Sequence, residues 1–494
     1  MKKFDSSDQT IFNYDEIVKK LNNSPDLKLR ELNSKDNTLQ IIFLNNLVET
    51  EYLNTHIIEY LTQLPSQQIH FQYIRENIPI GEVKVAKEIN EVTSLLIKGY
   101  AYLFFSSEQK GILVNIAETT ERALEKAETE SLVYGPKLSF TESLSTNIKI
   151  VRRNINDHNL CTEEVVVGNR VKQKVRIVYI KDIANSEDVE TIRQRLNEIE
   201  IDDIMDSSVL AQIMDDNSYS FFPQYVMTEL PDRFVYSITK GRIGILVDRS
   251  PISIICPSTF FSFFESTEDI YLRWFLSSAL RLLRIFAMIS SIFFSAFYVA
   301  AVTYQYELIP SSLLINIGQS RAKVPFPPLL ESLILEIMIE LLREAGARLP
   351  SKVGQTMGIV GGIVLGQAVV QAGLTSNILI IIVSLSALGS FASPSYEMGT
   401  ALRILRFPMI LLAGAWGFNG IMIGVCILLI HLLKLTSLGR PFLSPLYPLR
   451  IEDLKYAFFR LPQHFYRNRA TSNRPIDKQR LSWKTSNKED LDDI

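Results

Sequence analysis

The chain has 494 residues, of which 47% are hydrophobic and 21% charged, and its formal net charge is -3. This length allows several domains, and without a basic excess there is no reason to expect a nucleic-acid partner. The averages conceal a split, because residues 1–240 are rich in charge whereas residues 285–433 contain long uncharged stretches. We therefore expect a soluble N-terminal half followed by a helical membrane half.

The N-terminal half reads as two small α/β-type subdomains, an α+β fold overall. Residues 1–25 are polar and predict a flexible tail. Residues 26–133 alternate apolar runs of strand type with helical spacing, which is typical of an α/β layer. The expected elements are a strand at 39–44, a helix at 47–64, apolar runs at 95–105 around a turn at Gly99, and an Ala/Glu-rich helix at 118–130.

Residues 134–250 predict a second subdomain, of α+β type. Its expected elements are helices at 141–153, 186–199 and 209–214 and strands at 163–167, 174–180 and 242–247. Residues 252–264 are apolar and aromatic but number only about a dozen, whereas a bilayer crossing needs about 20 residues. We therefore expect residues 251–284 to form an interfacial segment before the membrane.

Residues 285–435 predict a helical, multi-pass transmembrane domain, and residues 436–494 predict a cytoplasmic tail. Backbone groups in lipid find no water to bond, so apolar segments that cross a bilayer should be helices. Four stretches are long and almost free of charge: residues 285–305, 353–375, 377–394 and 407–433.

The orientation in the membrane follows from charge. The N-terminus lacks the apolar run of a secretory signal, and a cluster of arginines at 273–284 precedes the first expected span, so the soluble half should be cytoplasmic. Four crossings return the basic tail to that side but leave Arg403 and Arg406 outside. A fifth crossing by residues 327–346 would place these arginines inside but the basic tail outside. This conflict favours an interfacial or re-entrant helix at 327–346.

That helix is amphipathic and acidic. Pro327 and Pro328 suit its first turn, and Gly346 followed by Pro350 ends it. Three glutamates repeat at four-residue spacing along one face: Glu336, Glu340 and Glu344. Two interpretations stay open: a solvated face with arginines close by, or an acidic lining of a cation path, since intramembrane carboxylates usually face a water-filled cavity.

The stretch at 353–375 carries a repeat of small residues. Four glycines recur every four residues and form one stripe, which lets a neighbouring helix approach closely: Gly354, Gly358, Gly362 and Gly366. Roughly opposite lies a mixed polar and small apolar face: Val360, Val364, Gln367 and Gln371. This pattern suits a pore-lining helix with a valine constriction, and it equally suits a helix buried in a bundle.

No catalytic constellation is present in the sequence. It contains no Walker A pattern and no nucleophile elbow, and its five histidines never fall at metal-ligand spacing. We therefore expect no enzyme, no cofactor and no metal site.

Several motifs together resemble the A subunit of the spore germination nutrient receptors. They lie at 135–144, 178–185, 246–248, 324–331, 342–350, 358–367, 405–407 and 439–445. In the helical half the matching positions are Pro325, Pro327, Pro328, Glu331, Arg343, Glu344, Gly346 and Pro350.

The resemblance implies a multi-pass protein of the spore inner membrane whose N-terminal domain faces the spore core. It implies a transporter-like B subunit and a lipoprotein C subunit as partners, and self-association into a ring, with a pentamer as the expected size. The ring would open to ions when nutrient binds and so trigger germination. A solute transporter or permease and a non-conducting scaffold subunit remain alternatives.

Overall fold

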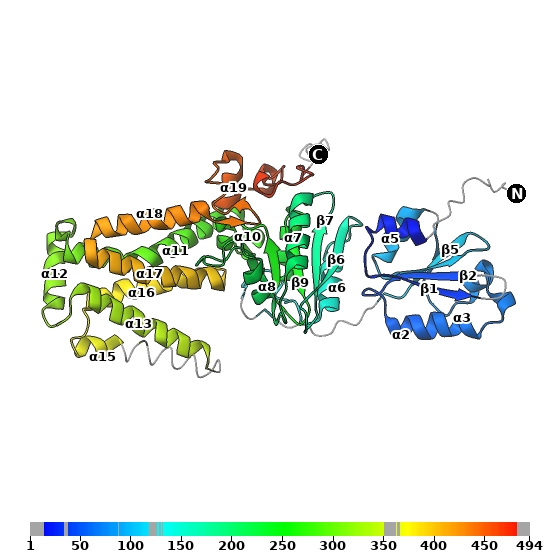
Figure 1. Cartoon of the computed structure of the whole chain (residues 1–494), viewed down its shortest axis with the longest axis horizontal. Helices are drawn as coiled ribbons and strands as arrows, with labels where there is room; N and C mark the ends of the chain where they lie inside the picture. Colours follow the sequence, from blue (N-terminus) through cyan, green and yellow to red (C-terminus); the bar gives the residue numbers. More distant parts are fainter. Residues whose placement is uncertain are drawn as a thin grey trace, which may run out of the picture.

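The computed structural model describes residues 14–33, 38–86, 88–117, 126–127, 130, 132–349, 362 and 366–481. Two sheets flanked by helices make up the N-terminal part, and a helical region follows. The first sheet, the second sheet and the helical region succeed one another along the long axis (Figure 1). The predicted division into a mixed α and β N-terminal part and a helical C-terminal part is confirmed.

The first sheet has five antiparallel strands in the order β1-β2-β4-β5-β3. The strands are β1 (Leu27–Asn33), β2 (Thr38–Leu44), β3 (Val83–Val85), β4 (Tyr100–Phe105) and β5 (Lys110–Asn115). The helices are α1 (Tyr14–Lys20), α2 (Thr50–Tyr52), α3 (Tyr60–Gln63), α4 (Phe71–Asn77) and α5 (Ile89–Leu96), with a π-helical segment Leu53–Glu59 joining α2 to α3.

Helices cover both faces of this sheet because its central strands are apolar on both. Along β2, Ile41 packs with the segment from α2 to α4, whereas Ile42 packs with α1 and α5. The turn predicted at Gly99 exists and has φ +89°, a conformation that suits glycine. The predicted helix at 118–130 lies largely outside the described residues.

The second sheet repeats this architecture, with five antiparallel strands in the order β6-β7-β9-β10-β8. The strands are β6 (Leu160–Val167), β7 (Gln173–Ile180), β8 (Val226–Thr228), β9 (Ile243–Val247) and β10 (Ser253–Cys256). The helices are α6 (Leu144–Asn154), α7 (Ser186–Glu198), α8 (Ser207–Met214) and α9 (Pro231–Thr239). Helices α7 and α8 pack on one face, and α6 and α9 on the other.

One sequence-based expectation for this unit needs correction. The apolar run at 252–264 was expected to be an interfacial segment, but β10 is a fully buried strand between β9 and β8. The following 3₁₀ turn, Phe260–Phe264, packs its phenylalanines into the core that this sheet shares with the helical region. The run is therefore apolar because sheet and helix packing bury it.

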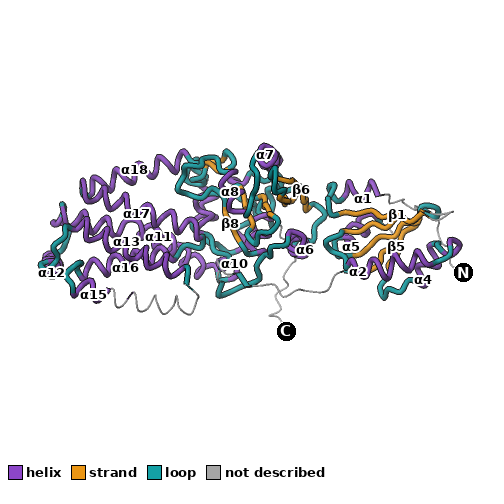
Figure 2. Tube along the Cα trace, turned by 60° about the horizontal axis from the view of Figure 1, so that its bottom comes forward, coloured by secondary structure: helices purple, strands orange, loops and turns teal. Residues whose placement is uncertain are grey.

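The helical region is built around one long helix. Its members are α10 (Glu268–Tyr271), α11 (Trp274–Thr303), α12 (Ser311–Arg321), α13 (Pro328–Ala347), α15 (Gly366–Gln371), α16 (Asn377–Phe391), α17 (Tyr396–Trp416) and α18 (Phe418–Lys434). Helix α11 contacts α13, α16, α17 and α18. Figures 1 and 2 show these five helices running side by side along the long axis.

The apolar stretch at 407–433 was expected to be one span, and this prediction is wrong. The chain reverses at Gly417, which has φ +62°, and α17 and α18 lie antiparallel on either side of it. Arg403 and Arg406 therefore lie within α17 and not in a loop. The first helix also begins earlier than the expected residue 285, at Trp274.

Because the chain reverses at Gly417, the start of α11 and the end of α18 both lie near the second sheet. His431, near the end of α18, contacts the hydroxyl of Ser220 at 3.1 Å. At the opposite end, the Tyr304 hydroxyl beyond α11 donates to the carbonyl of Gly414, 3.0 Å away. Two helices among the described residues, α11 and α17, are long and apolar enough to cross a membrane, and α16 and α18 are shorter apolar helices.

The C-terminal segment, residues 436–481, folds back onto the second sheet. It contains β11 (Thr436–Ser437), β12 (Arg440–Pro441), α19 (Leu454–Ala457) and short 3₁₀ turns. Arg440 forms an ion pair with Asp188 of α7, with 2.5 Å between Nη2 and Oδ2. Near its end, the backbone N–H of Ile476 donates to the carbonyl of Ile183, 2.9 Å away.

Candidate functional site in the helical region and its junction

Helix α13 buries two of its glutamates, Glu331 and Glu336. Its buried residues include Glu331, Ser332 and Glu336, whereas Leu341 on the opposite face is 65% exposed. A soluble amphipathic helix buries its apolar stripe, whereas α13 buries these glutamates beside Leu335 and exposes Leu341. The expectation of a solvated glutamate face therefore fails at Glu336, which is only 2% exposed.

The carboxylate of Glu336 joins three helices. It pairs with the guanidinium of Arg406 in α17 and accepts a hydrogen bond from Ser295 of α11 at 2.6 Å. Arg406 also donates to the carbonyl of Ser291, 2.9 Å away. Within the described part of the chain, this carboxylate is thus matched by a positive charge and a hydroxyl, as a buried charge requires.

A second buried carboxylate fixes the start of α16. Glu331 is fully buried and accepts a hydrogen bond from the backbone N–H of Ser376 at 2.6 Å. The guanidinium of Arg321, from α12, lies 3.5 Å from its other oxygen. The hydroxyl of Tyr298 in α11 contacts that of Ser376 at 3.2 Å. Glu331, one of the family-motif positions, therefore ties together α12, α13 and the α16 N-terminus.

The remaining glutamates of α13 lie progressively nearer the surface. Glu340 pairs with Arg343 at 3.2 Å and with Arg403 at 3.4 Å. Glu344 pairs with Arg348 at 2.5 Å, and both side chains are mostly exposed. The three glutamates of the predicted acidic face thus occupy different environments, from buried to exposed.

The other family-motif positions frame the same helix. Pro327 is its N-cap and Pro328 its first residue, as predicted from the suitability of proline there. Pro325 lies in the segment that joins α12 to α13. An added Cβ at Gly346 would meet no atom within 4 Å, and Pro350 lies outside the described residues.

The glycine-rich stretch is described only at Gly362 and from Gly366 onward. Val360, Val364, Gly354 and Gly358 lie outside the described residues. A Cβ added at Gly362 or at Gly366 would meet nothing within 4 Å. In α15, Gln367 and Gln371 are exposed and Val369 is buried. Whether these residues line a pore stays a prediction.

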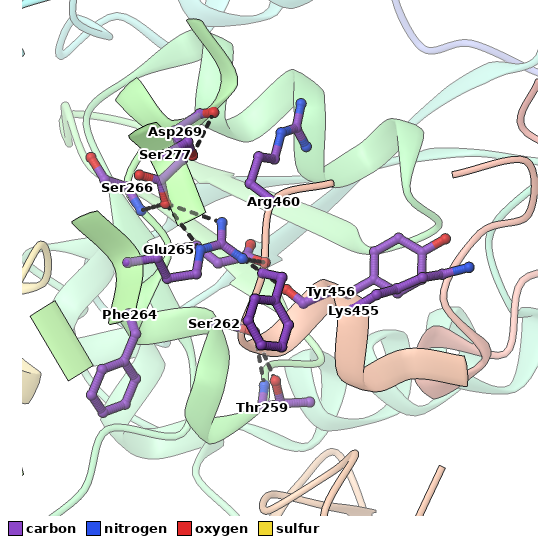
Figure 3. A network of polar contacts seen from close by, with 12 residues as sticks. Thr259, Ser262, Phe264, Glu265, Ser266, Asp269, Ser277, Lys455, Tyr456 and Arg460 are labelled. Carbon is purple, nitrogen blue, oxygen red and sulfur yellow. Dashed lines mark hydrogen bonds and ion pairs between the residues drawn. The ribbon is translucent and has the colours of Figure 1, made fainter. Parts of the chain in front are cut away.

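A cluster of charges joins the second sheet to α11 (Figure 3). Asp269 of α10 is 1% exposed and pairs with Arg281 at 3.0 Å and with Arg284 at 3.2 Å. The hydroxyl of Ser277 donates to the carbonyl of Asp269 at 3.0 Å, and the N–H of Ser266 donates to its carboxylate at 3.3 Å. These contacts hold the start of α11 against the chain that leaves the second sheet.

Glu265 lies in the same cluster, beside Tyr456 of the C-terminal segment (Figure 3). Its carboxylate is 3.6 Å from Lys240 and 3.7 Å from Arg281. Burial acts to raise the pKa of Glu265, but the neighbouring cations, Lys240 and Arg281 foremost, lower it to about 2. The group therefore stays ionised and stabilises the surrounding positive charges.

Sequence reasoning missed this cluster. Arg281 and Arg284 were interpreted only as markers of membrane orientation, although both are bound to a carboxylate. Asp269 lies 12 residues before Arg281, in a segment with no periodic pattern. The one available signal was the density of charge just before a long apolar helix.

The chain is similar to known proteins over most of its length. The sequence model of the family described as "Bacillus/Clostridium GerA spore germination protein" matches residues 15–472. The spore germination protein GerQA of Bacillus cereus is 40% identical over 456 residues, which cover 92% of this chain and 91% of that protein. The uncharacterized membrane protein YfkQ of Bacillus subtilis (strain 168) is 34% identical over 424 residues, 85% of this chain and 83% of that protein.

A solved structure is also similar in sequence. It is the crystal structure of the N-terminal domain of the A subunit of the Bacillus megaterium spore germinant receptor GerK3, with 27% identity and a TM-score of 0.39. The match covers 49% of this chain and 92% of that one. The chain therefore belongs to the Bacillus/Clostridium GerA family of spore germination proteins, and the resemblance to receptor A subunits that its motifs predicted is confirmed.

Proposed function

We propose that this chain is the A subunit of a nutrient-germinant receptor in the spore inner membrane, where it assembles into a ring that conducts ions when nutrient binds. The proposal has three parts: insertion into the membrane, assembly of copies, and conduction. Insertion is supported by one feature of the helical region, and assembly and conduction by another.

Multi-pass insertion is supported by the outer surface of the helices. Large apolar side chains are exposed on every long helix of the region, among them Leu283, Ile337, Leu388, Leu411 and Ile427. Soluble monomers rarely expose contiguous apolar surface of this extent. Charged groups such as Glu336 and Arg406 lie inside, which is the distribution that a bilayer imposes.

Orientation follows from the two ends of the helical region. Because α11 starts and α18 ends against the second sheet, the soluble units and the C-terminal segment share one side of the membrane. The arginines at the start of α11 favour the cytoplasmic or spore-core side by the positive-inside rule. This agrees with the expected position of the N-terminal domain and the tail.

Assembly and conduction are supported by one observation, the open space at two glycines and the exposure of two glutamines among the described residues from 362 to 371. Gly362 and Gly366 have open space where a neighbour's backbone could approach, and Gln367 and Gln371 are exposed amides. Amides facing lipid would be costly. Copies arranged in a ring would cover the glycines and leave the glutamines facing a central aqueous path.

The test substitutes residues of the expected ion path in spores and measures potassium release before and after nutrient is added. Val364→Ala should cause a leak without nutrient, because a smaller side chain weakens a dewetting constriction. Gln371→Leu should slow release after nutrient, because it removes a polar group from the path. Leu374→Ala, an exposed position just beyond α15, is the matched control. An immunoblot confirms equal subunit levels.

The same experiment separates the alternatives. Normal dormancy and normal release in both variants, at normal protein level, would contradict conduction along this segment. If Gly362→Leu then abolished assembly, the scaffold function would be favoured. Uptake of labelled nutrient by the purified chain alone would favour a transporter. The B and C subunits remain proposed partners, and their co-purification with the tagged chain tests that part.

A further inference from the structure

A small cavity lies between the second sheet and the C-terminal segment. Its volume is about 40 Å³, whereas one water molecule needs roughly 10–15 Å³ on the same measure, so it can hold a group of a few heavy atoms. Lys240 and Arg242 line it at the start of β9, and Ser444 and Arg480 line it from the C-terminal segment.

Two buried donors that line this cavity have no hydrogen-bond partner among the described residues. They are Nε of Arg242 and the hydroxyl of Ser444, in residues that are 8% and 5% exposed. Arg242 donates from Nη2 to the hydroxyl of Ser262 at 2.7 Å, which is a neutral partner. A buried donor without an acceptor is costly, so these donors point to an acceptor that the described residues do not supply.

The charge around the cavity is also out of balance. Glu265 lines it, but this carboxylate already faces the lining cations Lys240 and Arg242. It also faces Arg281 and Arg233, which pair with Asp269 and Glu130 as well. Asp453 lines it too, and its oxygens accept hydrogen bonds from Thr471 and Ser472.

Further cations gather on one side of the cavity. Three cationic groups surround the partly buried ring of Tyr236, at 4.0 Å for Lys240, 5.8 Å for Arg480 and 6.0 Å for Arg460. Burial lowers the pKa of Arg242, which is the direction expected for a cation that lacks enough negative charge nearby.

We propose that this cavity binds a small oxyanion or carboxylate group through Arg242 and Ser444, with Lys240 and Arg480 as the nearest additional positive charges. Donors from a guanidinium and a hydroxyl suit phosphate and carboxylate oxygens. The bound group would join the start of β9 to the C-terminal segment and hold that segment on the second sheet. Its source is either a free anion or the phosphate of an anionic lipid, because Glu265, which lines the cavity, also pairs with Arg281 of the apolar helix α11.

The test uses the purified full chain in detergent and follows its thermal unfolding. Inorganic phosphate or acetate replaces chloride at constant ionic strength, so that general screening does not change. A ligand that binds only the folded state raises the unfolding midpoint as its concentration passes the dissociation constant. We expect such a rise for the wild type and for Arg170→Gln, a matched control at a mostly exposed arginine far from the cavity.

Three variants locate the effect. Ser444→Ala and Arg480→Gln change a hydroxyl and a half-buried cation, so they should fold, and their apparent affinity should fall roughly 10-fold or more. Arg242→Gln should abolish the rise wherever the variant folds. A second arm places each protein in nanodiscs of phosphatidylcholine with or without phosphatidylglycerol. A rise that needs phosphatidylglycerol identifies the lipid as the source.

The result that overturns the proposal is equally specific. It is the absence of any shift with phosphate, acetate or phosphatidylglycerol, or an equal shift in Ser444→Ala, Arg480→Gln and the wild type. Either result would mean that the cavity holds only water.

Discussion

Glu336 of α13 and Arg406 of α17 form an ion pair inside the helical region, with side chains only 2% and 3% exposed. The pair links helices whose contacting residues lie 70 positions apart in the chain. Taking two charges out of water is costly, and the pair is stable only because Ser295 and backbone carbonyls complete its hydrogen bonds. Each charge therefore depends on the other.

Removing one partner should destabilise the helical region strongly. Arg406→Leu leaves the Glu336 carboxylate buried without a counter-charge, and losses of about 3–5 kcal/mol are typical of such changes. The double variant Arg406→Leu with Glu336→Leu should recover most of this loss, because neither charge remains. Denaturant unfolding of the purified chain in detergent measures all three proteins.

The exposed pair of Glu344 and Arg348 on the same helix is the control for that series. Its side chains are 60% and 79% exposed, so Arg348→Leu should change stability by about 1 kcal/mol at most. If Arg348→Leu cost as much as Arg406→Leu, burial would not explain the effect.

Gly417 should tolerate no side chain. Its φ of +62° with ψ of -139° is available almost only to glycine, and an added Cβ would lie 2.7 Å from Oε1 of Gln305. Gly417→Ala should cost about 1–3 kcal/mol and loosen the reversal between α17 and α18. Gly318→Ala, inside α12 with open space around it, should instead stabilise by about 0.5–1 kcal/mol.

The measurement for this comparison is the thermal unfolding midpoint of the two glycine variants beside the wild type. Equal shifts in the same direction would contradict the assigned backbone conformation at Gly417.

Local signals in the sequence predicted much of the N-terminal half. The strands near 39–44, 163–167 and 174–180 are present because their apolar patterns are strong within a few residues. Helix α7 begins where expected, and the Asn185 side chain caps it by accepting from the N–H of Glu187. Strands β8 and β10 were missed, because three or four buried residues carry no periodicity to detect.

The arrangement of the helices could not be predicted from local sequence patterns. An apolar run continues on both sides of Gly417, and a single glycine within such a run is common in membrane helices, so the reversal left no distinct signal. The inward direction of Glu336 depends on Arg406, and no spacing rule connects two such distant positions. The candidate pore positions Val360 and Val364 stay predictions because they lie outside the described residues.

Asp215 should make stability depend on pH where α8 meets the helical region. Burial, followed by the negative charges of Glu397 and Asp216, raises its pKa to about 7, while Arg195 opposes the shift. An unfolded aspartate has a pKa of about 3.9, so the folded state holds this proton more tightly. The associated stability is complete below about pH 4 and is lost as the pH rises through 7.

Asp215→Asn should remove this dependence, since the amide keeps the shape and cannot ionise. The unfolding midpoint of the variant relative to the wild type should therefore increase from pH 5 to pH 8. Asp202→Asn, at an exposed aspartate, is the control and should show no such trend. A constant difference between Asp215→Asn and the wild type across this range would contradict the raised pKa.

Asp26 should hold the two soluble units together. It is 3% exposed and lies between two arginines of the second unit, 3.4 Å from Arg152 and 3.1 Å from Arg176. Asp26→Asn removes the negative charge of this side chain. Two largely buried guanidinium groups then have less negative charge beside them. We expect hydrogen exchange on the full chain to accelerate in β1 and α6, the elements on either side of the contact, because the units separate more often.

Glu190→Gln, which changes an exposed partner of Arg193, should leave both elements unaffected. Unchanged exchange in Asp26→Asn would mean that packing between the units, and not this ion pair, keeps them in contact.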